Sequence, residues 1–298
     1  MAKKYLIFCL LVCLLLGSCE FVTQEQSDSA GAVHALLVGL SYDGTDYNTL
    51  SGTIPDVVSM DKTLFRLCSD TQREYLPVLM EQDSSYNNPS VETFPTKAHV
   101  LEQVDYLKSN AADNDLTIFF YSGHGLPSTD TEKNGALCLI NSKNKLECLY
   151  LPDLLDKINA IPGKKLIILD SCYSGNLVDL YGVTACTDIS TSDIFASYFS
   201  DASYGLTDLF LMTASTSETI SYDNDHGHGS FSLALLQALG WESDDTIKTA
   251  VALLDDKITI DSLYAYVLEN CNYRLFQHVT VNGTADDLVL FSYDDQDV

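Results

Sequence analysis

Two short glycine-bearing segments hold the residue types that nucleophilic catalysis needs. Tyr121–Gly125 reads YSGHG, and Asp170–Gly175 reads DSCYSG. A thiol beside an imidazole can attack a carbonyl carbon, because the ring accepts the thiol proton and later returns it to the leaving group. The glycines permit sharp turns and let a substrate backbone approach main-chain N–H groups, which can stabilise an oxyanion. The pair indicates acyl transfer, with Cys172 as nucleophile and His124 as acid/base.

Each segment alone is a weak signal. A single Cys after a strand is more often a small buried side chain than a nucleophile, and a single Gly-His-Gly turn is more often structural. Here the His and the Cys each follow an apolar run and stand 48 positions apart. Their combination is far more specific than either segment.

The apolar runs predict strands, and helical periodicities lie between them. Continuous apolar strands that alternate with helices indicate a mainly parallel sheet covered on both faces, in one α/β domain. Ligands bind such sheets beyond the carboxyl ends of the strands, which lie about 4.8 Å apart, so His124 and Cys172 should face one cleft. The expected strands are 34–40, 75–80, 116–121, 165–170, 209–213 and 288–291, and the expected helices are 56–67, 96–109, 151–158, 231–239 and 260–268.

Two segments lie outside this pattern. Residues 173–208 are rich in Ser, Thr, Asp and Tyr, and they read as a long excursion loop. Loops of this length are usually functional or disordered. The segment Asp223–Gly229 carries three Asp or Asn residues and two His. It lacks the closing Glu of a calcium-binding EF-hand loop, and it is interpreted as a polar loop at the cleft rim.

The first 18 residues read as a lipoprotein signal peptide. Lys3 and Lys4 precede an apolar run from Tyr5 to Leu16, which is shorter than the ~20 residues of a membrane span. The sequence Leu-Gly-Ser before Cys19 resembles the lipobox of bacterial lipoproteins, in which that Cys carries the lipid. We therefore predict an acylated Cys19 and a membrane-anchored protein of the bacterial cell envelope. Residues 19–33 are expected to be a flexible tether, and 34–298 the folded domain.

The composition limits the classes of partner. The chain has 42 acidic and 16 basic residues, a net charge of −26, and 46% hydrophobic residues. An acidic chain of this kind argues against nucleic-acid binding, which needs Lys and Arg surfaces. The charge either favours cationic partners such as basic peptides, or only keeps an exported protein soluble.

The cysteines do not form a metal-binding pattern. None of the six that remain beyond Cys19 is paired at C-x-x-C spacing, so no zinc site is expected. Cys138 and Cys148 flank a polar stretch, 141–145, that predicts a hairpin. They could form a disulfide outside the cytoplasm, although sequence does not fix connectivity.

These motifs resemble the caspase/metacaspase superfamily of cysteine peptidases, and they are closer to metacaspases and bacterial caspase-like proteins than to animal caspases. In caspases the His also stands about 50 residues before the Cys. The resemblance runs from about His34 to Phe291 and implies a three-layer caspase-haemoglobinase-like fold with a mainly parallel six-stranded sheet. Besides the two turns, it rests on Leu36–Tyr42, Gly229–Phe231, Tyr266-Val267 and Gln277.

The resemblance also implies roles for individual residues. Cys172 is the nucleophile, His124 is the general acid/base, and the N–H groups of Gly125 and Cys172 form the oxyanion hole. In metacaspases two Asp and a Ser line the primary specificity pocket, and here they fall on Asp170, Asp56 and Ser122. Carboxylates at the base of a cleft would pair with Arg or Lys. For Asp56 a second interpretation, as N-cap of the helix that follows, is equally good.

Departures from the family pattern limit these expectations. Metacaspases often bind calcium, but only Asp179 falls near one of the carboxylates and Asn141 stands where an Asp is expected. No cofactor is therefore expected, and calcium binding stays an open alternative. His278 replaces a Pro that often follows the closing Gln. Two alternatives stay open: a non-enzymatic binding module that keeps the fold, and a legumain- or gingipain-like peptidase of another specificity. The intact dyad argues against the first, and acids at 170 and 56 favour basic substrates.

Overall fold

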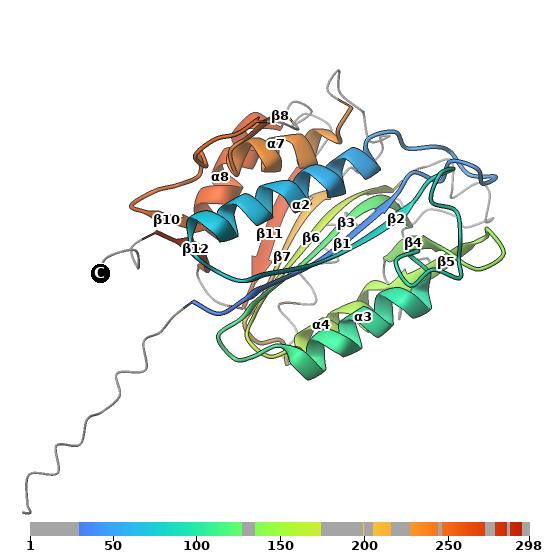
Figure 1. Ribbon diagram of the computed structural model, residues 1–298, viewed down its shortest axis with the longest axis horizontal. Helices are drawn as coiled ribbons and strands as arrows, with labels where there is room; N and C mark the ends of the chain where they lie inside the picture. Colours follow the sequence, from blue (N-terminus) through green and yellow to red (C-terminus); the bar gives the residue numbers. More distant parts are fainter. Residues whose placement is uncertain are drawn as a thin grey trace, which may run out of the picture.

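The computed structural model describes residues 30–126, 135–173, 199, 205–215, 227–243, 246–271, 278–284 and 287–293. Within these residues five helices accompany the strands (Figure 1). The helices are α2 (Thr53–Asp70), α3 (Lys97–Asn110), α4 (Leu151–Asn159), α7 (Ser230–Ala238) and α8 (Ile260–Asn270). The strands are β1 (Val33–Leu40), β2 (Tyr75–Gln82), β3 (Leu116–Leu126), β4 (Ala136–Ile140), β5 (Leu146–Tyr150), β6 (Lys164–Tyr173), β7 (Leu209–Ser215), β8 (Trp241–Ser243), β9 (Thr246–Ile247), β10 (Lys257–Thr259), β11 (His278–Gly283) and β12 (Val289–Ser292).

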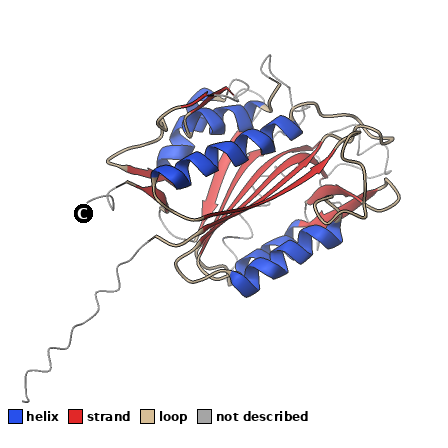
Figure 2. Cartoon of the chain, viewed as in Figure 1, coloured by secondary structure: helices blue, strands red, loops and turns tan. Residues whose placement is uncertain are grey.

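A central sheet separates two helical layers. Its strand order is β11-β7-β6-β3-β1-β2, with the β4–β5 hairpin joined to the end of β3. The pairs β2–β1, β1–β3, β3–β6 and β6–β7 are parallel, and β11 runs antiparallel to β7. Helices α2, α7 and α8 cover one face, and α3 and α4 cover the other (Figures 1 and 2). The predicted α/β class with a mainly parallel sheet is confirmed.

The strand sequences explain this layering. β3 is buried along its whole length, with side chains that alternate between two hydrophobic clusters. Ile118 and Phe120 pack with the α2 and α7 side chains, whereas Phe119 and Tyr121 pack with those of α3 and α4. A strand covered on both faces needs an unbroken apolar run, because successive side chains point to opposite sides.

The predicted helices and five of the six predicted strands are found in their expected places, with shifted bounds, and the differences lie in the sheet and at the carboxyl-terminal end. The main sheet has eight strands instead of six, because the β4–β5 hairpin joins it. The run 288–291 does form a strand, β12, but it pairs with β10 in a small separate sheet. The sixth strand of the main sheet path is instead β11, which the sequence did not predict. The edge position agrees with the few apolar residues of its sequence, HVTVNG. Of the β11 side chains that the structure describes, Val279 is buried in the core.

Several predictions concern residues outside the described part of the chain. The signal peptide, Cys19 and most of the tether belong to this group, as do Asp179, Gln277 and the excursion loop between Tyr173 and Gly205 apart from residue 199.

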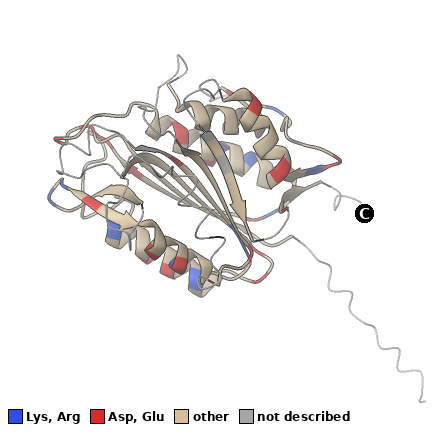
Figure 3. Ribbon diagram, turned by 180° about the vertical axis from the view of Figure 1, so that it is seen from behind, with Lys and Arg blue, Asp and Glu red and all other residues tan. Residues whose placement is uncertain are grey.

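The chain is held to the domain from Gly31 onward, where Arg73 Nε donates to the Gly31 carbonyl at 2.6 Å. Of the helices that the structure describes, none combines the length and apolar character of a membrane span. Acidic residues occur on both helical layers (Figure 3).

A pair of buried tyrosines fixes the carboxyl ends of β1 and β3. Tyr42 Oη accepts a hydrogen bond from the His124 N–H at 2.9 Å and donates to the Cys138 carbonyl at 2.7 Å. Tyr121 Oη lies 2.7 Å from the His124 carbonyl and 3.1 Å from Tyr42 Oη. A Cβ on Gly123 would come within 2.6 Å of one hydroxyl and 2.9 Å of the other, so the pair requires glycine there.

Tyr42 itself adopts an uncommon backbone conformation. Its φ is +60°, in the left-handed region that bulky residues rarely occupy. Both tyrosines are fully buried, and burial raises the pKa of each phenol well above its ordinary value. The hydroxyls therefore stay protonated, and their hydrogen bonds offset the strain of this turn.

Removal of the Tyr42 hydroxyl should destabilise the domain. In Tyr42→Phe the ring stays, but the buried His124 N–H and Cys138 carbonyl lose a partner, which costs about 1–3 kcal/mol. Urea unfolding measures this difference. Tyr86→Phe, with a 58% exposed side chain, is the matched control and should leave stability unchanged. Equal stability of wild type and Tyr42→Phe would contradict the role given to this hydroxyl.

Candidate active site

The register of two central strands brings the catalytic candidates together. β3 and β6 pair in parallel, with His124 opposite Cys172 and Ser122 opposite Asp170. Paired residues on neighbouring strands lie about 4.8 Å apart, so the backbone at Cys172 adjoins that at His124. The sequence placed both residues just past the strand ends. The structure instead extends β3 to Leu126 and β6 to Tyr173, so the two motifs are continuations of the strands.

The His124 ring has a defined orientation. Its Nε2 lies 2.8 Å from the carbonyl oxygen of Asn48, in the segment after β1, and its ring centroid lies 4.4 Å from that of Tyr42. A carbonyl can only accept a hydrogen bond, so Nε2 carries the proton. In the neutral ring Nδ1 is then the nitrogen with a free lone pair, and it is the one that can accept a proton.

Burial sets the charge state of this imidazole. The His124 side chain is 4% exposed, and desolvation lowers its pKa from the ordinary value, while the hydrogen bond to Asn48 opposes the shift. A lowered pKa favours the neutral ring, which is the form that can act as a base. Burial thus favours a neutral His124 ring, with Nδ1 unprotonated.

Gly125, the expected oxyanion donor, lies one position beyond His124. It is buried, and it is in register with Tyr173 of β6 on one side and Leu137 of β4 on the other. The pairing of β3 with β1 ends at Ser122, and beyond it β3 pairs with β4 of the hairpin on that side. The role of the Gly125 and Cys172 N–H groups stays a prediction.

Asp56 lies in a buried polar cluster, and its interpretation as an N-cap is wrong. α2 begins at Thr53 with Gly52 as N-cap, so Asp56 stands inside the first turn. Its carboxylate, 1% exposed, accepts bonds from Ser122 Oγ at 2.8 Å and from the Gly229 N–H at 3.2 Å, and lies 2.9 Å from His228 Nδ1. Burial raises the Asp56 pKa despite these contacts, because desolvation outweighs them.

Asp170 lies beside this cluster and is held by α7. Its Oδ2 accepts bonds from Ser232 Oγ at 2.6 Å and from the Ser232 N–H at 3.2 Å. A Cβ on Gly229 would collide with Asp170 Oδ2 and lie 3.2 Å from Asp56 Oδ2. Gly229 therefore allows the main chain to pass directly between the two acids. The structure thus brings Asp56, Ser122 and Asp170 together, and their role in substrate binding stays a prediction.

This group, which we call the acid pocket, lines a cavity of only about 10 Å³. Such a space holds at most one water molecule. The described conformation therefore has no room for an Arg or Lys side chain. His228, Gly229 and Ser232 already contact the carboxylates of Asp56 and Asp170.

The sequence did not identify several residues that build the site. His228 was assigned only to a polar rim loop, yet it is 3% exposed and contacts Trp241 edge-on at 4.8 Å. Ser232 and the Asn48 carbonyl carry no sequence signal of their own, and Tyr42 entered only as the last residue of the segment Leu36–Tyr42. A His directly before the Gly-Ser-Phe motif was the one available hint for His228.

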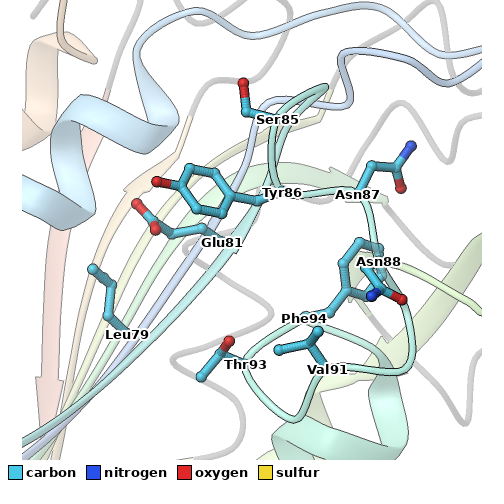
Figure 4. A pocket seen from close by; sticks show the side chains of 9 residues that line it. All are labelled: Leu79, Glu81, Ser85, Tyr86, Asn87, Asn88, Val91, Thr93 and Phe94. Atoms are coloured by element: carbon cyan, nitrogen blue, oxygen red, sulfur yellow. The ribbon is translucent and has the colours of Figure 1, made fainter.

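A larger cavity lies away from these residues. It has a volume of about 270 Å³ and opens beside β2 and the loop that follows, with Leu79, Glu81, Tyr86 and Phe94 among its lining residues (Figure 4). None of the residues that the sequence predicts for the site lines it. Its size alone therefore does not identify the catalytic centre.

The described residues contain no group of three or more His, Cys, Asp or Glu placed to hold a metal ion. Asn141, at the position where the resemblance would require a calcium ligand, accepts bonds from the N–H groups of Lys143 and Lys145 and closes its own turn. Its side-chain oxygen is thus already used by the hairpin.

Comparison with known proteins identifies the family. The model of the metacaspase peptidase C14 domain matches residues 33–181, half of the chain. Metacaspase-1 of Meyerozyma guilliermondii is 31% identical over 169 residues, which are 53% of this chain and 39% of that protein. Metacaspase-5 of Trypanosoma cruzi is 29% identical over 163 residues, 51% of this chain and 35% of that protein. The chain thus spans less than half the length of these relatives.

Solved structures show the same fold. Protein GSU0716 of Geobacter sulfurreducens superposes with a TM-score of 0.52 at 16% identity, over 86% of this chain and 95% of that one. The Drosophila initiator caspase Dronc gives a TM-score of 0.52 at 10% identity, over 89% and 84%. Taken with the sequence match, these structures confirm the expected superfamily: the chain belongs to the metacaspase (peptidase C14) family and has the caspase fold.

Proposed function

We propose that this chain is a cysteine endopeptidase that cleaves polypeptides after Arg or Lys. The observation that carries the proposal is the β3–β6 register, which sets His124 opposite Cys172. The hydrogen bond from Nε2 to the Asn48 carbonyl supports it, because it leaves Nδ1 as the proton acceptor. Membership of a peptidase family supplies the reaction class.

In the proposed reaction His124 accepts the proton of the Cys172 thiol, and the thiolate attacks the carbonyl carbon of the scissile bond. The main-chain N–H groups of Gly125 and Cys172 would stabilise the tetrahedral oxyanion. Protonated His124 then gives its proton to the leaving amine, and a thioester forms. Water, deprotonated by His124, attacks the thioester, which releases the carboxylate product and restores the thiol.

The basic specificity rests on the acid pocket. Two carboxylates within one buried cluster attract a guanidinium or ammonium group, and a charge-assisted pair in a buried site is strong. Because the pocket is closed in the described conformation, the substrate side chain would replace the internal donors of Asp56 and Asp170. Opening would move the start of α7, where His228 and Ser232 lie.

We also propose that Cys19 carries a lipid and anchors the enzyme to the cell envelope, on the basis of the Leu-Gly-Ser-Cys sequence after an apolar run. Stable attachment requires acyl chains with enough buried CH₂ groups. Cys19→Ser should therefore move the protein from the membrane fraction to the soluble fraction of detergent-free lysates. Unchanged partition would contradict acylation at this residue.

The dyad assignment is tested by substitution and by pH. Cys172→Ala and His124→Ala should each abolish turnover of an Arg peptide without loss of folded protein, because the two side chains act as a unit. Since burial lowers the His124 pKa, the neutral ring persists below the ordinary pKa of about 6.5. The acid limb of kcat/KM in wild type should therefore lie below that value.

Two outcomes would contradict the dyad assignment. The first is turnover by purified Cys172→Ala. The second is a kcat/KM profile whose acid limb lies above pH 6.5. The group that must lose a proton for activity would then not be the buried His124 imidazole. Circular dichroism of both variants serves as the folding control.

The acid pocket is tested with peptides that differ only at the residue before the scissile bond. Asp170→Asn should lower kcat/KM for Arg and Lys peptides by about 30-fold or more, since an incomplete buried charge pair costs about 2–5 kcal/mol. Asp46→Asn is the matched control, because Asp46 is exposed and pairs with Lys145 on the surface. A wild-type preference for Asp or Asn peptides would refute the basic specificity.

A further inference from the structure

The β4–β5 hairpin holds two cysteines in direct opposition. Cys138 of β4 is paired in register with Cys148 of β5. Cys138 is fully buried, Cys148 is partly buried, and both are thiols in the structure. Facing residues of an antiparallel pair point to the same side of the sheet, so both thiols lie on one face.

The hydrogen bonds of the hairpin define which kind of pair this is. The Asn141 N–H donates to the Lys145 carbonyl at 2.8 Å, and the Leu151 N–H donates to the Gly135 carbonyl at 3.1 Å. Hydrogen-bonded and non-hydrogen-bonded pairs alternate along an antiparallel ladder. The two bonds make 141/145 and 135/151 hydrogen-bonded pairs, so by alternation 139/147 and 137/149 are hydrogen-bonded as well. Cys138/Cys148, which lies between these two, is therefore a non-hydrogen-bonded pair.

A non-hydrogen-bonded pair has the spacing that a cross-strand disulfide needs. Its Cα atoms lie about 4.5 Å apart, closer than in the hydrogen-bonded pairs. Disulfides join Cα atoms about 4.4–6.8 Å apart and Cβ atoms about 3.5–4.5 Å apart. Two facing cysteines at such a position therefore need little backbone movement to form the bond.

We propose that Cys138 and Cys148 form a redox site, closed as a cross-strand disulfide by a disulfide oxidant such as oxidised glutathione. The thiolate of Cys148, the more exposed of the two, attacks one oxidant sulfur, displaces one thiol and forms a mixed disulfide. The Cys138 thiolate then attacks the Cys148 sulfur and displaces the second thiol. Two protein thiols become one disulfide, their two protons go to solvent and the released thiolates, and the oxidant is reduced to two thiols.

The environment of the pair predicts slow exchange and a lasting bond. Burial raises the pKa of the Cys138 thiol, and burial raises that of Cys148 despite the positive charge of Lys97. Since only the thiolate reacts, both cysteines should be poor nucleophiles before oxidation. A disulfide sheltered in this way also resists reduction, and it would persist outside the cytoplasm.

The hairpin is connected to the catalytic strand through its backbone. The Cys138 carbonyl accepts a hydrogen bond from Tyr42 Oη, and Tyr121 Oη lies 3.0 Å from it. Tyr42 Oη in turn accepts the His124 N–H. A cross-link at Cys138 would therefore hold the carbonyl on which the tyrosine pair and the His124 peptide depend, whether or not the proposed peptidase specificity is correct.

The sequence offers a direct assay for the bond. Trypsin cleaves after Lys133, Lys143, Lys145 and Lys157, so it separates a peptide of residues 134–143 from one of residues 146–157. The full-length Cys172→Ala protein, which lacks the proposed catalytic thiol, is incubated with oxidised or reduced glutathione, alkylated under denaturing conditions and digested. Mass spectrometry should find the two peptides joined in the oxidised sample and separately alkylated in the reduced sample.

Thermal unfolding supplies the second measurement. Oxidation should raise Tm by several degrees, and the same treatment should leave Tm unchanged in Cys148→Ser, because the cross-link restricts the unfolded chain. Cys68→Ser is the control for a buried cysteine elsewhere and should keep the redox effect. The proposal is overturned if both cysteines stay separately alkylated, if exchange stops at a glutathione adduct, or if either one bonds to another cysteine.

Discussion

The site depends on one register, the parallel pairing of β3 with β6. This pairing sets His124 opposite Cys172 and Ser122 opposite Asp170 at the same time. Both strands are buried, so a slip by one residue would turn their apolar side chains from one cluster to the other. The hydrophobic core therefore fixes the pairing of the two strands on which the proposed dyad depends, and the tyrosine pair holds the His124 peptide at the end of β3.

The second constraint is the burial of charge beside that register. Asp56 of α2 and Asp170 of β6 are buried beside the start of α7, where an unpaired carboxylate would be costly. The chain satisfies them with His228, Ser122, Ser232 and the Gly229 N–H. These donors stabilise the closed pocket, and a basic side chain would compete with them. Substrate affinity would then depend on how readily the start of α7 moves.

Sequence patterns predicted the strands that are continuous apolar runs and the residues that belong to recognisable motifs. Continuous apolar runs such as 116–121 predicted the buried strands, and the paired motifs predicted the proximity of His124 and Cys172. Local features with weak patterns were missed. β11, an edge strand, has too few apolar residues to be recognised. The start of α2 was placed too late, because its N-cap, Gly52, has no side chain that could signal a cap. Tyr42 ends the segment Leu36–Tyr42 and His228 precedes Gly229–Phe231, but no local pattern encodes their contacts with residues far along the chain.

Active-site labelling tests the central claim most directly, because it reports where the reactive thiol is. A peptide chloromethyl ketone that ends in Arg should alkylate wild type once, at Cys172, and should fail to do so in His124→Ala. The other described cysteines, Cys68, Cys138, Cys148 and Cys271, are buried or partly buried and should stay unmodified. Labelling at one of these instead of Cys172, or equal labelling in His124→Ala, would contradict a dyad built by the β3–β6 register.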